Sequence, residues 1–229
     1  MRNTLKLYEF PPTRSIRVRW TLQEMQLDFE SIFVNLPARE HHAAEFLKIN
    51  PAAKIPVLVD GNLVLIESVA IVLYLAEKYP EKGFTPASVA DRGLMTQWLL
   101  FAATELEQPL WRITRHTRLY PAARRIAAEI PNARQDFQEM AKVLDAHMQD
   151  RQFVVGDSAC VADFVVAYTL DWADELDLLE PFPRLSAYLE SMYDRPRAAP
   201  RIADAMQVIR QSQARSGLPP MSGAAPCSS

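Results

Sequence analysis

Residues 50–79 read NPAAKIPVLVDGNLVLIESVAIVLYLAEKY. Two short apolar runs flank Asp60-Gly61, a pair typical of a tight turn, so this stretch predicts a β-hairpin. Residues 67–78 then place apolar side chains on one side at helical spacing, which predicts a helix directly after the second strand.

The residues around the hairpin form a candidate binding site. Pro56 enters the first strand without an N–H, and a cis bond before it would turn the backbone N–H and C=O of Ile55 outward, where an extended peptide can pair with them. Ser68 at the helix start can offer its hydroxyl and N–H to a carboxylate, and Glu67 can accept from an ammonium group. Together they would bind the α-amino-acid end of a small peptide. The alternative is that Glu67 and Ser68 only start a helix and that Pro56 marks a strand edge.

The rest of the chain divides into a mixed part and a helical part. Before the hairpin, residues 5–10 and 29–35 predict strands and residues 15–26 and 42–48 predict helices. After Pro80 the strand signals end, and helices are predicted at 92–118, 122–150, 162–172, 184–193 and 200–215. An α/β unit followed by helices alone predicts two domains. We place them at 1–80 and 91–215, joined by a linker at 81–90 and followed by a tail at 216–229 rich in Gly, Pro, Ser and Ala.

Composition excludes several classes of function. The 25 Lys and Arg residues nearly balance the 28 Asp and Glu residues, so the net charge of −3 gives no electrostatic case for nucleic acid or an anionic membrane. Cys160 and Cys227 are too few for a disulfide framework or a zinc site, which fits a reducing, cytoplasmic compartment. The first residues lack a long apolar run, so we expect neither a signal peptide nor a membrane span.

The segments 50–58, 65–71 and 74–80 resemble the glutathione-site core of the cytosolic glutathione transferases, and the resemblance covers essentially the whole chain except the tail. It implies a thioredoxin-like N-terminal domain with a cis bond before Pro56, followed by an all-helical domain. It also implies glutathione as co-substrate without a metal, and a homodimer. The closest features are those of serine- or threonine-type members, with theta-like and zeta-like traits.

The resemblance also assigns glutathione contacts. Glu67 and Ser68 would hold the γ-glutamyl end, and Ile55 would pair with the cysteinyl backbone. Lys54 and His41 match basic residues that meet the glycyl carboxylate, with the register at His41 open to a shift of one residue. In the helical domain, aromatic residues and an arginine after residue 92 would line the second-substrate site; the candidates are Phe101, Trp111, Arg115 and Tyr120.

The group that activates the thiol is the open part of the site. A free thiol has a pKa of ~8.5, and a hydroxyl donor at a helix N-terminus lowers it. Serine-type members carry this hydroxyl a few residues before an arginine of the first helix. Thr13 lies four residues before Arg17 and Ser15 is the second candidate, although Pro12 stands where several classes have Ser or Cys. Both hydroxyls can also cap the helix. Tyr8, within the first strand, is a weaker alternative.

Residues 156–163 resemble the family's capping-box segment, with Cys160 where Ser or Thr is usual. Asp163 would reach back to the N–H of Cys160, and we expect this to be a folding feature with an inert, buried thiol. No cysteine lies near the first helix, so thiol–disulfide exchange through a protein cysteine is not expected.

Three functions fit these features. The first is an enzyme that binds glutathione, stabilises its thiolate and conjugates it to a small, largely apolar electrophile. The second is a glutathione-dependent isomerase of the maleylacetoacetate type, suggested by the zeta-like run Arg17-Val18-Arg19. The third is a non-catalytic binding or regulatory module with the transferase fold.

Overall fold

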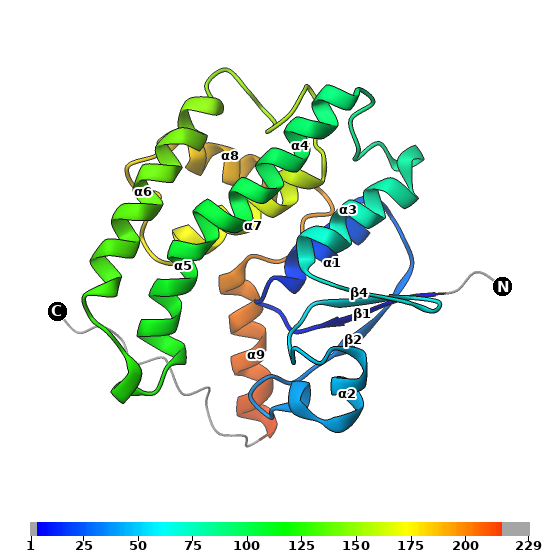
Figure 1. Cartoon of the computed structure of the whole chain (residues 1–229), viewed down its shortest axis with the longest axis vertical. Coiled ribbons are helices and arrows are strands. Elements are labelled where there is room, and N and C mark those ends of the chain that lie inside the picture. The colour runs from blue at the N-terminus through cyan, green and yellow to red at the C-terminus, as the bar shows by residue number, and fades with distance from the viewer. Residues whose placement is uncertain (1–3, 217–229) are drawn as a thin grey trace.

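A computed structural model describes residues 4–216. Apart from Ser216, the predicted tail lies outside the described residues. The N-terminal part has the predicted order β-α-β-α-β-β-α (Figure 1). Its elements are β1 (Leu5–Glu9), α1 (Ser15–Glu24), β2 (Phe29–Phe33), α2 (Ala44–Ile49), β3 (Val57–Asp60), β4 (Leu63–Ile66) and α3 (Ser68–Lys78).

The four strands form one mixed sheet in the order β2-β1-β3-β4. β2 runs parallel to β1, whereas β3 is antiparallel to both β1 and β4. Helices α1 and α3 lie on one side of the sheet and α2 lies on the other (Figure 1). Because side chains alternate along a strand, the paired Leu7 and Leu58 face the large core and the paired Tyr8 and Val57 face the smaller core around Phe46. The sheet is therefore the predicted thioredoxin-like one.

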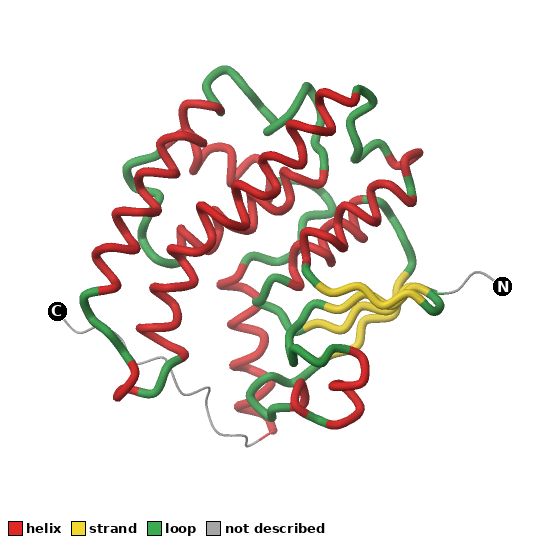
Figure 2. The backbone as a smooth tube through the Cα atoms, in the orientation of Figure 1, coloured by secondary structure: helices red, strands yellow, loops and turns green. Residues whose placement is uncertain are grey.

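Within the described residues, the C-terminal part consists of helices joined by loops and contains no strand (Figure 2). Its α-helices are α4 (Val89–Phe101), α5 (Glu107–Thr114), α6 (Glu129–His147), α7 (Val161–Asp174), α8 (Pro183–Tyr193) and α9 (Ile202–Ser216). Two π-helical segments, η3 (Ala102–Leu106) and η4 (Arg115–Leu119), continue α4 and α5, so the helix predicted at 92–118 is one rod interrupted by wider turns. Short 3₁₀ turns occur at η1 (Glu40–His42), η2 (Pro80–Lys82) and η5 (Ala122–Arg124).

The helix predicted at 122–150 is wrong at its start. Residues 122–124 form only the turn η5, and α6 begins at Glu129. Pro131 explains the difference, since proline lacks an N–H and is tolerated in the first turn of a helix but not in its interior. A helix that contains Pro131 therefore has to start close before it.

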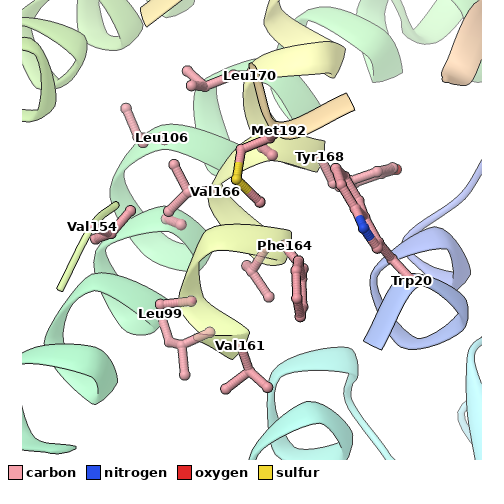
Figure 3. Packing of buried hydrophobic residues seen from close by; sticks show 14 of the residues in the cluster. Trp20, Leu99, Leu106, Val154, Val161, Phe164, Val166, Tyr168, Leu170 and Met192 are labelled. Carbon is pink, nitrogen blue, oxygen red and sulfur yellow. The ribbon is translucent and has the colours of Figure 1, made fainter. Parts of the chain in front are cut away.

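One hydrophobic core joins the two parts. Trp20 of α1 stacks on Phe164 of α7 with 5.5 Å between the ring centroids, and both side chains are fully buried (Figure 3). Helix α7 is buried along almost its whole length, as expected for a central helix of a bundle. At the far end of α1, Arg195 pairs with Glu24 through two hydrogen bonds of 2.6 and 2.8 Å. The helical part thus fixes α1, whose N-terminus carries the candidate activating residues.

Candidate active site

The start of α3 is an open helix N-terminus. Glu67, directly before it, is exposed and has a left-handed backbone (φ 70°), and no side chain caps the helix. Such a conformation costs a non-glycine residue about 1–3 kcal/mol and is retained where the surroundings impose it, often at functional sites. The first N–H groups of a helix have no partner within it. The α3 start therefore presents backbone donors beside an exposed carboxylate.

The Ser68 hydroxyl accepts a hydrogen bond from a buried arginine. Arg17, only 1% exposed, donates from Nη1 to Ser68 Oγ at 3.2 Å. Because the serine oxygen accepts this bond, its own proton is left to be donated to another acceptor. An anion at the α3 start would meet that hydroxyl together with the free N–H groups.

Lys54 and Ile55 lie on the loop before β3, and because Val57 of β3 pairs with Ile66 of β4, this loop runs beside the residues that start α3. Asn50 donates from Nδ2 to the carbonyl of Lys54 at 2.7 Å and accepts from the Ala52 N–H at 3.0 Å, which fixes the turn. The Ile55–Pro56 peptide bond is cis, as the family resemblance implied. Within residues 4–216, no backbone hydrogen bond uses Ile55 and no ion pair uses the exposed Lys54. The backbone of Ile55 and the ammonium group of Lys54 are therefore available to bind a ligand.

His41 lies on the turn η1, half-buried against His42, with 4.2 Å between the ring centroids. Its Nδ1 is buried and has no hydrogen-bond partner among the described residues. Desolvation lowers the pKa of His41 below its ordinary value, and the neighbouring His42 and Arg39 lower it further. The imidazole is therefore neutral at neutral pH and would act as a hydrogen-bonding group rather than as a cation.

The two candidate activating hydroxyls lie in contact at the start of α1, Thr13 two residues before it and Ser15 as its first residue. Thr13 Oγ1 and Ser15 Oγ are 2.9 Å apart, and Thr13 Oγ1 donates to the Phe10 carbonyl at 2.6 Å. Ser15 is completely buried and also accepts from the Phe10 N–H at 3.4 Å, whereas Thr13 is partly exposed. Of the two, Thr13 is the one that a ligand can reach.

A charged cluster behind these hydroxyls joins α1 to the helical part. Glu107, the first residue of α5, accepts from Arg14 Nε on one carboxylate oxygen and from Arg17 Nη2 on the other. Arg17 Nη2 also donates to Thr169 Oγ1 at 2.8 Å. Burial alone raises the pKa of Glu107, but Arg17 and Arg14 outweigh it and hold the pKa below its ordinary value. Glu107 is therefore ionised and ties both arginines in place.

The candidate second-substrate residues fall into separate groups. Trp111 lies under the Arg14 guanidinium at 4.9 Å, close to the activating hydroxyls in this charged cluster. Arg115 lies over Tyr120 at 4.6 Å, further along the same helical rod. Phe101 instead packs edge-on against Trp98 beside the core, at 5.1 Å.

Sequence reasoning missed three residues of this region, namely Glu107, Arg14 and Trp172. Trp172 lies 5.4 Å from the Arg14 guanidinium and donates from Nε1 to Thr114 Oγ1 at 3.1 Å. A usable signal existed only for Glu107, an acid within the apolar helical stretch around Leu106 and Leu110. Arg14 carries no such signal, because arginines in a run such as Arg14, Arg17 and Arg19 ordinarily lie on a solvated helix face.

The two remaining candidates, Tyr8 and Cys160, lie in surroundings that indicate a structural role. Tyr8 packs against Phe46 on the α2 side of the sheet, with 6.1 Å between the ring centroids. Burial raises the pKa of the Cys160 thiol far above its ordinary value, and the adjacent Asp163 carboxylate adds to this effect. The thiol is therefore protonated and unreactive at neutral pH.

No helix within residues 4–216 has both the length and the apolar character that a membrane crossing requires. Across the same residues, no three His, Cys, Asp or Glu side chains gather in a way that would hold a metal ion.

Comparisons with known proteins identify a single family. The model of the glutathione S-transferase N-terminal domain matches residues 3–77, and that of the C-terminal domain matches residues 103–196. The chain is 35% identical to glutathione S-transferase F10 of Arabidopsis thaliana over 62% of this chain and 68% of that protein. It is 31% identical to glutathione S-transferase Z2 of the same plant, over 84% and 87%.

Among solved structures, Ure2p5 of Phanerochaete chrysosporium, cocrystallized with 1-(S-glutathionyl)-2,4-dinitrobenzene, has a TM-score of 0.77 to this chain at 26% identity. The similarity covers 94% of this chain and 98% of that one.

Proposed function

The chain belongs to the glutathione S-transferase family and is a transferase enzyme, and from this premise we propose that it conjugates glutathione to a small, largely apolar electrophile. The observation that carries the proposal is the open α3 start, where Arg17 holds Ser68 with its proton free to be donated. Ser68 and the α3 N–H groups would receive the γ-glutamyl carboxylate, and Glu67 would accept from the γ-glutamyl ammonium.

The other end of glutathione would lie along the loop before β3. The unpaired backbone of Ile55 suits an extended cysteinyl residue, and the exposed Lys54 suits the glycyl carboxylate. His41, neutral at neutral pH, would donate a hydrogen bond to the same carboxylate. Because Arg17 of α1 bonds to Ser68, the start of α1 lies beside the proposed glutathione site, and the cysteinyl thiol would face Thr13 there.

Thr13 is the proposed thiolate donor and Ser15 its positioning residue. When the Ser15 hydroxyl donates to Thr13 Oγ1, the Thr13 proton is the one left to turn from the Phe10 carbonyl to the sulfur. Lowering the thiol pKa by two units from ~8.5 requires ~2.7 kcal/mol of preferential stabilisation of the anion. A charge-assisted hydrogen bond near a helix N-terminus supplies an amount of this order.

The test combines calorimetric titration with glutathione and a pH scan of thiolate absorbance in the complex. We expect Thr13→Ala to return the thiol pKa toward ~8.5, and Thr13→Ser to keep it lowered. Ser15→Ala should leave most of the shift in place. Absence of glutathione binding to the unmodified chain would refute the proposal, and equal loss in the Thr13→Ala and Ser15→Ala variants would refute the assignment of roles.

A homodimer is part of the same proposal. The edge strand β4 exposes Leu63, Val64 and Ile66, and α4 exposes Val89 and Leu94. Large apolar side chains gathered on a sheet edge and a helix are typical of a protein–protein interface. Sedimentation analysis at micromolar concentration should give twice the monomer mass.

The run Arg17-Val18-Arg19, which suggested the isomerase hypothesis, has arginines that are bound by other residues of the protein. Arg17 bonds to Glu107, Thr169 and Ser68, while Arg19 pairs with the buried Glu9 of β1. The run Arg17-Val18-Arg19 therefore gives no separate support to isomerisation, and conjugation remains the proposed reaction.

A further inference from the structure

Arg14 combines a fixed position with unused hydrogen-bond donors. Its Nε is bound to Glu107, and its guanidinium lies over Trp111 at 4.9 Å and over Trp172 at 5.4 Å. Its terminal nitrogens make no hydrogen bond to any described residue, and its side chain is 30% exposed. An arginine whose orientation is fixed while two of its nitrogens remain free is prepared to bind a planar anion in a bidentate manner.

The charges around Arg14 do not balance. Arg14 and Arg17 each carry a positive charge, and Glu107 is the only carboxylate among the described residues that pairs with either of them. Arg17 is almost fully buried, and its other partners, Thr169 and Ser68, are neutral. One positive charge is therefore left without a counter-ion in a partly dry region, and Arg14 is the member of the pair that solvent reaches.

The positive charge continues along the helical rod beyond Trp111. Arg115 and Arg124 both lie over Tyr120, at 4.6 and 4.5 Å, and neither forms an ion pair with any residue in the described part of the chain. Arg112, on the same rod, differs because it is bound by Glu129 and Asp136. Arg115 on the rod and Arg124 on the turn η5 after it add positive potential to this side of the helical part, which would attract an anionic molecule.

Resting on the proposed function, we propose that Arg14 determines the specificity of the second-substrate site, which takes a planar aromatic or conjugated electrophile bearing a carboxylate. The two tryptophans would contact the flat part of the electrophile, and the free guanidinium nitrogens would bind its carboxylate. Thr13 is the adjacent residue, so the reacting carbon would lie near the thiolate while the anionic group is held at Arg14.

Two chloroaromatic electrophiles that differ only in a carboxylate serve as probes: 1-chloro-2,6-dinitrobenzene and 4-chloro-3,5-dinitrobenzoate. In both reactions the glutathione thiolate attacks the carbon that bears chlorine, a C–S bond forms, the C–Cl bond breaks, chloride leaves, and the thiol proton passes to water. The decisive measurement is calorimetric binding of the two preformed conjugates. Binding needs no turnover, so it separates this inference from the proposed reaction.

We expect the unmodified enzyme to bind the conjugate whose aromatic ring bears a carboxylate at least tenfold more tightly than the conjugate whose ring lacks it. Arg14→Gln should reduce the ratio of the two affinities to near one, and Arg14→Lys should reduce it partly, since lysine keeps the charge but not the fork. Arg112→Gln is the matched control and should leave the ratio unchanged. Steady-state values of kcat/KM for the two electrophiles should change in the same direction.

Equal affinity of the unmodified enzyme for both conjugates would overturn the inference without any variant. An equal loss for both conjugates in Arg14→Gln would also overturn it, because Arg14 would then act on the scaffold or the thiolate. Glutathione binding with a lowered thiol pKa but no charge preference would overturn this inference alone. Failure to bind glutathione would overturn the proposed function as well.

Discussion

The helices α3 and α7 begin in opposite ways. At the start of α7, Asp163 accepts from the Cys160 N–H at 2.9 Å, from the Val154 N–H at 2.8 Å and from the Tyr188 hydroxyl at 2.8 Å, and the Cys160 side chain completes a capping box. All of this lies in the core. At the start of α3 no side chain caps the helix, and Glu67 turns outward on a left-handed backbone.

The difference shows how one structural element serves two purposes. Every helix start presents N–H donors that need partners. The α7 start satisfies them internally and so contributes to stability, whereas the α3 start leaves them for a ligand and so loses some stability. Substitutions at the helix starts test this contrast, and the largest effect is expected at α7.

Asp163→Ala should destabilise the protein by about 3–5 kcal/mol, because it leaves several buried donors without an acceptor. That is a large part of the stability of an ordinary domain. Urea unfolding followed by far-UV circular dichroism measures it, with Asp163→Asn as the milder control. A loss below about 1 kcal/mol would mean that the α7 start is not the closed, stabilising one.

The start of α9 is intermediate between those of α3 and α7, because the carboxylate that caps it, Asp171, changes its protonation state with pH. Asp171 accepts from the Ile202 N–H at 2.8 Å and from the Tyr193 hydroxyl at 3.2 Å, and burial raises the pKa of Asp171 to about 6, although these bonds and Arg201 oppose the shift. The folded state therefore holds a proton on Asp171 that the unfolded chain has lost. This group destabilises the fold increasingly as pH rises from about 4 to about 6, and the full effect is present above that range.

The free energy of unfolding of the unmodified protein, relative to Asp171→Asn, should fall by on the order of 3 kcal/mol between pH 4 and pH 7. Urea titrations of both proteins at several pH values measure the difference. Parallel pH profiles for the two proteins would show that Asp171 has an ordinary pKa and that the α9 start does not titrate in this range.

Ser68→Ala should weaken glutathione binding more than tenfold, or at least ~1.4 kcal/mol, while changing the free energy of unfolding by only about 1 kcal/mol. Calorimetric titration and urea unfolding give the two values. Ser158→Ala, an exposed serine just before α7, is the matched control and should change neither. A larger loss of stability than of binding in Ser68→Ala would place the α3 start among the structural ones.

Cys160→Ser should have the smallest effect, a gain of about 0.5–1 kcal/mol in stability, because a hydroxyl caps a helix better than a thiol. Thermal unfolding measures it, and glutathione affinity should stay unchanged. A change in affinity would connect the α7 start to the binding site and remove the contrast between the two helices.

How well the fold could be predicted depended on how far apart in the sequence the residues that determine each element lie. The hairpin and the α3 start lie within residues 50–79, where turn, strand and helix signals agree with one another, whereas the cis bond before Pro56 was implied by the family resemblance. The error at α6 came from a local signal, Pro131, that the apolar spacing overrode. Where short-range rules applied, they were sufficient.

The candidate site was predictable only in part, for a related reason. Glu67, Ser68 and Lys54 could be named because they sit at fixed offsets from the hairpin. The partner of Ser68 could not be named, since Arg17 lies 51 residues from Ser68 in the sequence and Glu107, the partner of Arg17, lies 90 residues from Arg17. Nothing local distinguishes an arginine that turns into the core from one on a solvated face, because that choice depends on the helical part.

The π-helical segment η3 has a genetic consequence. A π turn closes over one residue more than an α turn, so η3 holds an extra residue without rotating the helix that follows it. Deleting the exposed Thr104 would thus convert this turn to an α turn, while Glu107 still faces Arg17 and Trp111 still faces Arg14. A single-codon deletion in η3 should therefore be far less damaging than one in α4 or α5, and the lineage can vary in length at this segment.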